Sequence, residues 1–223
     1  MPSRLRPTTS YAADAILVGD PGRALLLAQE LLEQPKMSNH ARGLWGYSGE
    51  TPDGRPLTIQ STGIGGPSAA LVLGDLAKLG VRRALRIGTC VGFGETAAAG
   101  ELLVVEVALA AVGSSAAHGV APGEAAKPDD RLTARLAEQL RTEGRRAAIA
   151  SFDVHPRGES PPGGAVAGDM QTAPLLARSA ALGIAAAALL IVAETARGEQ
   201  LDGEALAAVE KRAGRLSAAI LST

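Results

Sequence analysis

"ALRIGTCVGFG", residues 84–94, is the stretch that decides the fold we expect for this chain. Its first part, ALRIG, is a short apolar run typical of a buried strand. Its second part has three glycines within seven residues, at 88, 92 and 94. Arg86 and Thr89 add a cation and a hydroxyl to this glycine-rich stretch. The sequence therefore predicts a strand that enters a glycine loop able to hold an anion, with Gly88 allowing a tight turn at the strand end.

The same arrangement occurs twice before this stretch. DAILVGDPGR (14–23) and RPLTIQSTGIGGPS (55–68) each join an apolar run to a glycine turn. Helical spacing follows in RALLLAQELLEQ (23–34) and in SAALVLGDLAKLG (68–80), where Gly80 suits a helix end. Alternation of short strands with helices is typical of α/β proteins with parallel pairing.

The second half of the chain continues the alternation. We expect strands at 101–111, 147–151 and 184–194, and helices at 129–144, 171–183 and 203–221, with Gly144 ending the first of these helices. The first of these strands is apolar on both faces, which favours a central place in the sheet. The predicted fold is α/β, a single domain over residues 1–223 whose mixed, mostly parallel sheet is flanked by helices.

Composition limits the possible functions. A net charge of −1 gives no general attraction to nucleic acid or to an anionic membrane. The longest apolar run, residues 183–194, is about half the ~20 residues that a membrane helix needs. We find no secretory leader pattern, and the single cysteine, Cys90, fits a reducing compartment. We therefore expect a cytoplasmic protein without nucleic-acid or membrane partners.

The glycine turns do not match the common nucleotide-binding motifs. GIGGPS resembles the G-x-G-x-x-G dinucleotide pattern, but position 68 is Ser and no acidic residue closes a second strand about twenty residues on. No G-K-[ST] follows any glycine run, which excludes a P-loop. Arg23 and Arg86 lie beside two of the turns, and a planar guanidinium suits bidentate binding of phosphate. The sequence therefore leaves two interpretations of these arginines open: they bind an anion, or they form ordinary surface ion pairs.

Four motifs in order carry a family resemblance. AILVGDPGRA (15–24), NHARGLWGYSGE (39–50), STGIGGPSAA (61–70) and LRIGTCVGFG (85–94) resemble the hexameric nucleoside phosphorylases, the group of bacterial purine nucleoside and uridine phosphorylases. The resemblance is dense over residues 14–107 and returns at 168–194. It implies cleavage of a nucleoside by orthophosphate, giving free base and ribose 1-phosphate, with no metal or organic cofactor.

The resemblance also implies a phosphate site. Its members are Gly19, through a backbone N–H, and the side chains of Arg23, Arg42, Arg86 and Thr89, with Arg86 also counted as catalytic. Arg42 matches an arginine that reaches phosphate across a dimer interface. The expected partners are therefore nucleoside, phosphate and further copies of this chain, in a homo-oligomer built from dimers and up to a hexamer.

The implied nucleoside site departs from the family pattern. Where the family has Glu-Met-Glu at the sugar, this chain has Asp169, Met170 and Gln171, so the charged acceptor for the ribose hydroxyls is replaced by an amide. Glu194 stands where the purine branch has an acidic or amide residue facing the base, and we expect it to donate a proton to the base. His155 falls near the position of a ring that stacks on the base.

Alternatives remain within this family and outside it. A uridine-type phosphorylase would use a Gln-x-Arg pair, of which only Arg157 has a possible counterpart here. A hydrolase would not need the arginines. A binding paralogue without activity would explain the altered sugar segment. The three histidines, His40, His118 and His155, lack metal-ligand spacing, so we expect no metal.

Overall fold

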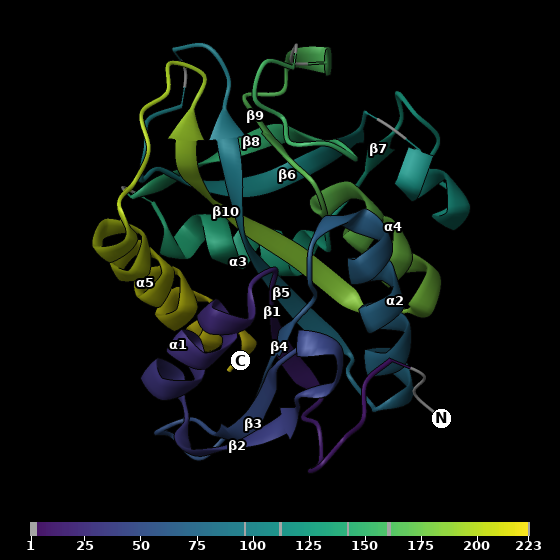
Figure 1. The fold of residues 1–223 in the computed structure, drawn as a ribbon, viewed down its shortest axis with the longest axis vertical. Helices are drawn as coiled ribbons and strands as arrows, with labels where there is room; N and C mark the ends of the chain where they lie inside the picture. The colour runs from purple at the N-terminus through teal and green to yellow at the C-terminus, as the bar shows by residue number, and fades with distance from the viewer. Residues whose placement is uncertain (1–3, 96, 112, 142, 160–161, 223) are drawn as a thin grey trace.

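The computed structural model describes residues 4–222 apart from 96, 112, 142, 160 and 161, and within them a ten-stranded sheet is flanked by helices (Figure 1). The strands are β1 Asp14–Val18, β2 Glu33–Asn39, β3 Gly46–Glu50, β4 Pro56–Ser61, β5 Arg83–Gly92, β6 Leu102–Ala110, β7 Ala125–Ala126, β8 Gly144–Ser151, β9 Ala167–Asp169 and β10 Ala185–Thr195. The helices are α1 Pro21–Leu31, α2 Gly65–Lys78, α3 Asp130–Gln139, α4 Thr172–Leu182 and α5 Gly203–Leu221, with 3₁₀ turns η1 Ala41–Gly43, η2 Gly113–His118 and η3 Pro162–Gly164.

Two parts of the sheet share strand β5. On one side β5, β1 and β4 run parallel, and β3 and β2 extend the sheet antiparallel. On the other side β5, β10, β6, β8 and β9 pair in a closed ring, because β10 bonds to both β5 and β6 while β9 bonds to both β8 and β5. The α/β architecture with a mixed sheet, predicted from the sequence, is confirmed. Parallel pairing holds the centre, and antiparallel pairs extend one edge and close the ring.

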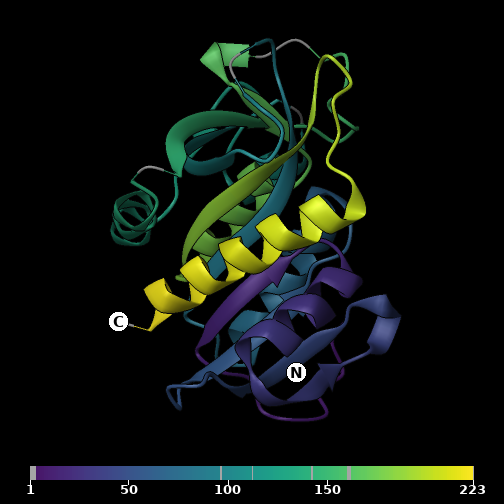
Figure 2. The same ribbon diagram turned by 90° about the vertical axis from the view of Figure 1, so that its left-hand side faces the viewer.

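The core lies on both faces of the sheet. Alternate residues of β5 point to opposite sides, so that Leu85 and Ile87 pack with α1, α3 and α5, whereas Ala84 and Cys90 pack with α2 and α4. Figures 1 and 2 show the two helix groups on opposite sides of the sheet. This double cover explains why β5 and β10 are apolar along most of their length.

The helix expected over 23–34 ends at Leu31, and Glu33 begins β2. Two further predicted boundaries are wrong, and each has a packing reason. The helix expected over 129–144 ends at Gln139, and Gly144 begins β8 instead. A Cβ on Gly144 would lie 2.6 Å from the carbonyl oxygen of Leu102, so the glycine allows β8 to approach β6 closely. The expected loop after ALRIG is strand as well, since β5 continues to Gly92 alongside β10. The helix expected at 203–221 is confirmed at both ends as α5.

Candidate active site

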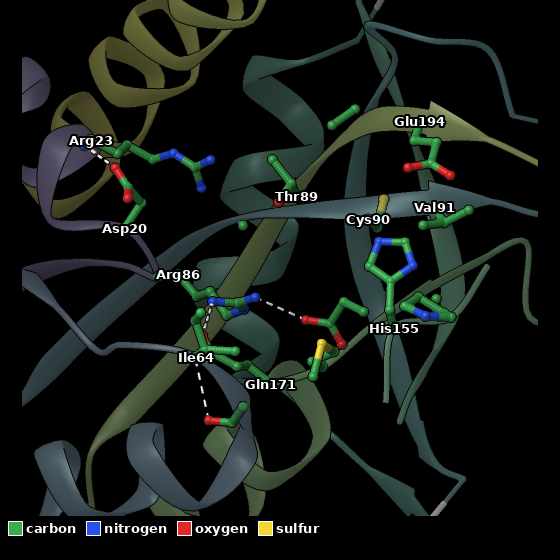
Figure 3. Close-up of a pocket in the computed structure, with 18 of the residues that line it drawn as sticks. Asp20, Arg23, Ile64, Arg86, Thr89, Cys90, Val91, His155, Gln171 and Glu194 are labelled. Atoms are coloured by element: carbon green, nitrogen blue, oxygen red, sulfur yellow. Dashed lines mark hydrogen bonds and ion pairs between the residues drawn. The ribbon is translucent and has the colours of Figure 1, made fainter. Parts of the chain in front are cut away.

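A cavity of about 640 Å³ opens at the carboxyl ends of the parallel strands. Turns after β1 and β4, the second half of β5, the segment 168–171 and the end of β10 all contribute to its wall. This is the edge where open α/β sheets bind ligands. Figure 3 shows Arg23 and Asp20 at one end, Glu194 and His155 at the other, and Arg86 with Gln171 between them. The lining residues are Gly19, Asp20, Pro21, Arg23, Gly63, Ile64, Gly65, Arg86, Gly88, Thr89, Cys90, Val91, His155, Pro156, Gly168, Asp169, Met170, Gln171, Ala193 and Glu194.

Arg86 is fixed at the centre of this cavity by three side chains. Its Nε donates to Thr172 Oγ1 at 3.0 Å, its Nη1 to Gln171 Oε1 at 2.7 Å, and its Nη2 to Asp169 Oδ2 at 2.9 Å. The Arg86 side chain is 4% exposed, and Asp169 neutralises its charge. A guanidinium has five N–H donors, so these bonds leave two of them for a ligand. The result is a guanidinium that is held in one orientation at the cavity wall by the protein itself.

Gly88 makes room for that arginine. A Cβ at position 88 would lie 2.6 Å from Arg86 Nη2 and 2.7 Å from Leu190 Cδ2. Gly88 belongs to β5 and does not form the tight turn that we expected from the sequence. Arg86 and Gly88 both line the cavity, but the reason that the sequence suggested for the glycine is wrong.

Asp169 is fully engaged within the protein. Its Oδ1 accepts from Ser151 Oγ at 2.5 Å, and its Oδ2 accepts from Thr172 Oγ1 at 2.6 Å besides Arg86. The backbone N–H of Thr172 adds a further bond to this carboxylate at 3.0 Å. Asp169 therefore orients Arg86, and its oxygens are not directed to a ligand.

Gln171 is likewise bonded to the chain on both atoms of its amide. Its Nε2 donates to the carbonyl oxygens of Gly63 at 2.6 Å and Gly65 at 3.2 Å. Its Oε1 accepts from Arg86, and Thr62 Oγ1 lies 3.2 Å from the same oxygen. Gln171 connects Arg86 to the turn between β4 and α2, a role that the sequence did not suggest.

Arg23 adds a second cation to the cavity, at the end where Asp20 also lies. Asp20 caps α1 by accepting from the backbone N–H of Arg23 at 2.8 Å, which sets the position of Arg23 in the first turn. Glu210 of α5 binds Arg23 Nε at 2.5 Å, and burial raises the pKa of Glu210 despite this pair. Gly19 and Thr89 line the same cavity. Four of the five predicted phosphate residues, all but Arg42, thus share one cavity.

Arg42 lies apart from the cavity of its own chain. It is exposed in η1, beside the β2–β3 pair, and its φ of 61° is a left-handed conformation uncommon for a residue other than glycine. Arg42 does not line the cavity.

The far end of the cavity is organised around Glu194. Arg157 Nε forms an ion pair with Glu194 Oε1, and Gln200 Nε2 donates to Glu194 Oε2 at 3.0 Å. The bond from Arg157 is the main cause that lowers the pKa of Glu194. A proton donor at neutral pH needs a raised pKa, so this geometry favours an ionised carboxylate over the acid that we expected. His155 lines the same end, one residue from Pro156.

Sequence reasoning missed several groups that support the cavity. Ser151 and Thr172 bind Asp169, and Thr62 contacts Gln171, although all three lie in regions named for other reasons. All three carry a hydroxyl at the end of a strand or the start of a helix. Such hydroxyls are too frequent in sequences to identify a site residue. Ile64 is 84% exposed at the cavity wall, and such an apolar side chain in a glycine turn could have been noticed. In the described part of the chain, no group of three or more His, Cys, Asp or Glu could hold a metal ion.

None of the helices described is both long and apolar enough to cross a membrane. Comparison with known proteins finds sequence relatives that match part of this chain. The chain is 34% identical over 99 residues to the DeoD-type purine nucleoside phosphorylase of Clostridium beijerinckii. The aligned region covers 44% of this chain and 41% of that protein. The Oceanobacillus iheyensis protein of the same name is 42% identical over 80 residues, 35% of this chain and 34% of that protein. These matches thus span less than half the length of either relative.

The fold agrees with a solved structure over almost its whole length. The crystal structure of uridine phosphorylase from Vibrio fischeri ES114 superimposes with a TM-score of 0.85 at 21% identity, covering 95% of this chain and 92% of that one. The family model described as the phosphorylase superfamily matches residues 14–156. Because that match extends over more than half of the sequence, this chain belongs to the phosphorylase superfamily.

Proposed function

We propose that this chain catalyses the phosphorolysis of a nucleoside, of the purine type in preference to the uridine type, to free base and pentose 1-phosphate. One observation carries the proposal: a buried, internally neutralised Arg86 presents its remaining donors to a cavity that Arg23 and Thr89 also line. The names of the two sequence relatives favour the purine type. Orthophosphate is the co-substrate, and no cofactor is required.

The proposed reaction follows the length of the cavity. Phosphate binds between Arg23, Arg86, Thr89 and the backbone N–H of Gly19, which hold it in position for attack. A phosphate oxygen forms a bond to the anomeric carbon while the carbon–nitrogen bond to the base breaks. The electron pair goes to the base, which takes up one proton, and this balances the proton that hydrogen phosphate loses as it becomes pentose 1-phosphate. The fixed guanidinium groups lower the barrier because they need no rearrangement when charge moves.

The base then lies toward Glu194 and His155. An ionised Glu194 suits a hydrogen bond from an N–H of the base. To donate a proton, as we expected from the sequence, Glu194 would first have to be released from Arg157. Met170 lies beside Gln171 in the wall between the two ends.

The proposed active unit contains more than one copy of the chain. Arg42 is exposed and does not reach its own cavity, so a phosphate contact by Arg42 requires a second copy. We propose a homo-oligomer built from dimers, up to a hexamer.

A direct assay tests the function. Purified protein is given inosine, adenosine, guanosine or uridine, with and without phosphate, and release of free base is followed by chromatography. We expect base and pentose 1-phosphate in equal amounts, only with phosphate, and faster for a purine nucleoside. Equal release without phosphate would show hydrolysis, and faster turnover of uridine would favour the uridine type.

A further inference from the structure

The middle of the cavity lacks a free anionic acceptor. The carboxylates that line the cavity in the described residues are Asp20, Asp169 and Glu194. Asp20 is exposed at the Arg23 end, and Glu194 is held by Arg157 and Gln200 at the other end. Asp169, between them, has both oxygens bonded to protein groups. A hydroxyl that enters the middle of the cavity therefore meets no available carboxylate.

Gln171 does not fill this gap. Both hydrogens of its amide are directed to the carbonyls of Gly63 and Gly65, and its oxygen faces Arg86 and Thr62. Thr62 has a single hydroxyl hydrogen, shared between Gln171 and the carbonyl of Val18 at 3.0 Å. Gln171 as a whole is 3% exposed, and its amide oxygen already contacts Arg86 and Thr62.

The amide cannot easily be replaced by a carboxylate in the same position. A Glu at 171 has no hydrogen to donate to the two glycine carbonyls, which would repel its charge from 2.6 and 3.2 Å. The carboxylate would therefore point away from these two carbonyls and toward the open cavity. The residue type at 171 thus decides whether the side chain at this position bonds to the protein or offers an acceptor to a ligand.

This arrangement has a consequence for the sugar, and it rests on the proposed function. In phosphorolysis the sugar lies between phosphate and base, which is the part of the cavity beside Gln171 and Asp169. A buried hydroxyl without an acceptor loses its bond to water and gains none in return. We propose that Gln171 makes the site selective for 2′-deoxyribonucleosides, because a deoxyribose brings one hydroxyl fewer to a part of the wall where the carboxylate of Asp169 and the amide of Gln171 are both bonded to the protein.

The test compares matched pairs of substrates that differ only in the 2′-hydroxyl. With saturating phosphate, kcat/KM is measured for inosine and 2′-deoxyinosine, adenosine and 2′-deoxyadenosine, and uridine and 2′-deoxyuridine. We expect the deoxy substrate of the preferred base to be favoured about tenfold, the effect of one unpaired buried hydroxyl. Equal turnover of the pair, or preference for the ribonucleoside, would overturn the proposal while leaving phosphorolysis intact.

A variant tests the assigned residue. In Gln171→Glu we expect the ratio to shift toward the ribonucleoside by about tenfold, as a carboxylate accepts from the sugar hydroxyls. Gln139→Glu makes the same charge change at the exposed end of α3 and should leave the ratio unchanged. If Gln171→Glu folds and keeps the ratio of the natural protein, Gln171 does not set the selectivity. If it does not fold, the ratio of the natural protein still decides the proposal.

Binding separates this inference from the proposed reaction. Calorimetric titration of the same pairs into the natural protein without phosphate measures binding in the absence of turnover. Tighter binding of the deoxynucleoside here, together with no base release in the assay with phosphate, would support the sugar selectivity and contradict phosphorolysis. Equal or tighter binding of the ribonucleoside, or no binding of any nucleoside, would overturn the selectivity.

Discussion

The two ends of the cavity are built in different ways. Toward the proposed phosphate end, Arg86 emerges from a central strand, is 4% exposed, and is bonded to Asp169, Gln171 and Thr172. At the base end, Arg157 belongs to the irregular connection between β8 and β9, and its side chain is 55% exposed. The first end is fixed before any ligand arrives, whereas the second depends on one exposed ion pair.

This contrast separates the parts of the reaction that need rigidity from those that differ among substrates. Every phosphorolysis uses the same phosphate, so fixed donors at that end serve all nucleosides. The base varies, and loops on a rigid scaffold are where proteins vary their specificity. We therefore expect substitutions at the phosphate end to abolish activity and those at the base end to change its dependence on substrate and pH.

The largest effect is expected for Arg86→Ala. The variant loses two charge-assisted donors to phosphate, so its KM for phosphate should rise by about 100-fold or more. It also leaves Asp169 buried without its cation, which destabilises folding by about 3–5 kcal/mol. Initial rates against phosphate concentration and a thermal melt measure the two effects.

Arg131→Ala, on the exposed side of α3, is the matched control and should change neither quantity. An unchanged phosphate KM in Arg86→Ala would remove Arg86 from the phosphate site. Arg86→Lys keeps the charge but not the fork of donors, so it should recover stability more than phosphate affinity.

A smaller effect of the same kind is expected for Gly88→Ala. The added Cβ would lie 2.6 Å from Arg86 Nη2, so the guanidinium must move by part of an ångström. Overpacking of this kind costs about 1–3 kcal/mol of stability. Displacement of a positioned group should lower kcat/KM for phosphate by about tenfold or more.

The control for that variant is Gly203→Ala, at the start of α5, where an added Cβ meets no atom within 4 Å. Both variants add one methyl group to a glycine in regular structure. If Gly88→Ala retains the phosphate kinetics of the natural protein, the fit between Gly88 and Arg86 is not required for phosphate binding.

The same contrast explains how far the sequence alone could lead. The sequence could predict that Arg23, Arg86 and Thr89 lie together, and all three line the cavity, because glycine turns with arginines at strand ends are visible in the local pattern and in the motifs of the family resemblance. The role of Gln171 could not, since its four polar contacts come from segments more than eighty residues away, at 62–65 and at Arg86. Local pattern also misjudged Gly88 and Gly144, where close approach of a distant segment, not a turn, requires the glycine.

Glu194 shows the same limit at the base end. Its position facing the cavity was predicted from its place in the motif at 168–194, and it does line the cavity. Its ionisation depends on Arg157 and Gln200, which reach it from two separate connections. A pKa is a property of such tertiary contacts and cannot be assigned from the residue type.

The smallest effect is expected for Arg157→Ala, and it appears mainly in the pH dependence. Arg157 lowers the pKa of Glu194, so its removal should return that pKa toward the ordinary carboxyl value. On acidification, Glu194 would then take up its proton at a higher pH than in the natural protein. The acid limb of the kcat/KM profile should therefore move to higher pH. If Glu194 acts as a proton donor instead, the variant should gain activity on the acid side, so the direction of change separates the two roles.

Stability gives an independent check with a defined sign. A carboxyl with a lowered folded-state pKa adds stability above its unfolded pKa, and this contribution is lost as the pH falls through the folded-state value. Natural protein should therefore melt slightly above Arg157→Ala at neutral pH, and the two melting temperatures should converge in acid. Arg146→Ala removes a comparably exposed partner from the Arg146–Glu106 pair, 3.2 Å apart and far from the cavity wall, and should leave the pH profile of activity unchanged. A melting difference that persists below the pKa of Glu194 would mean that Arg157 stabilises the connection by packing, and that the base end is less dependent on this ion pair than the geometry indicates.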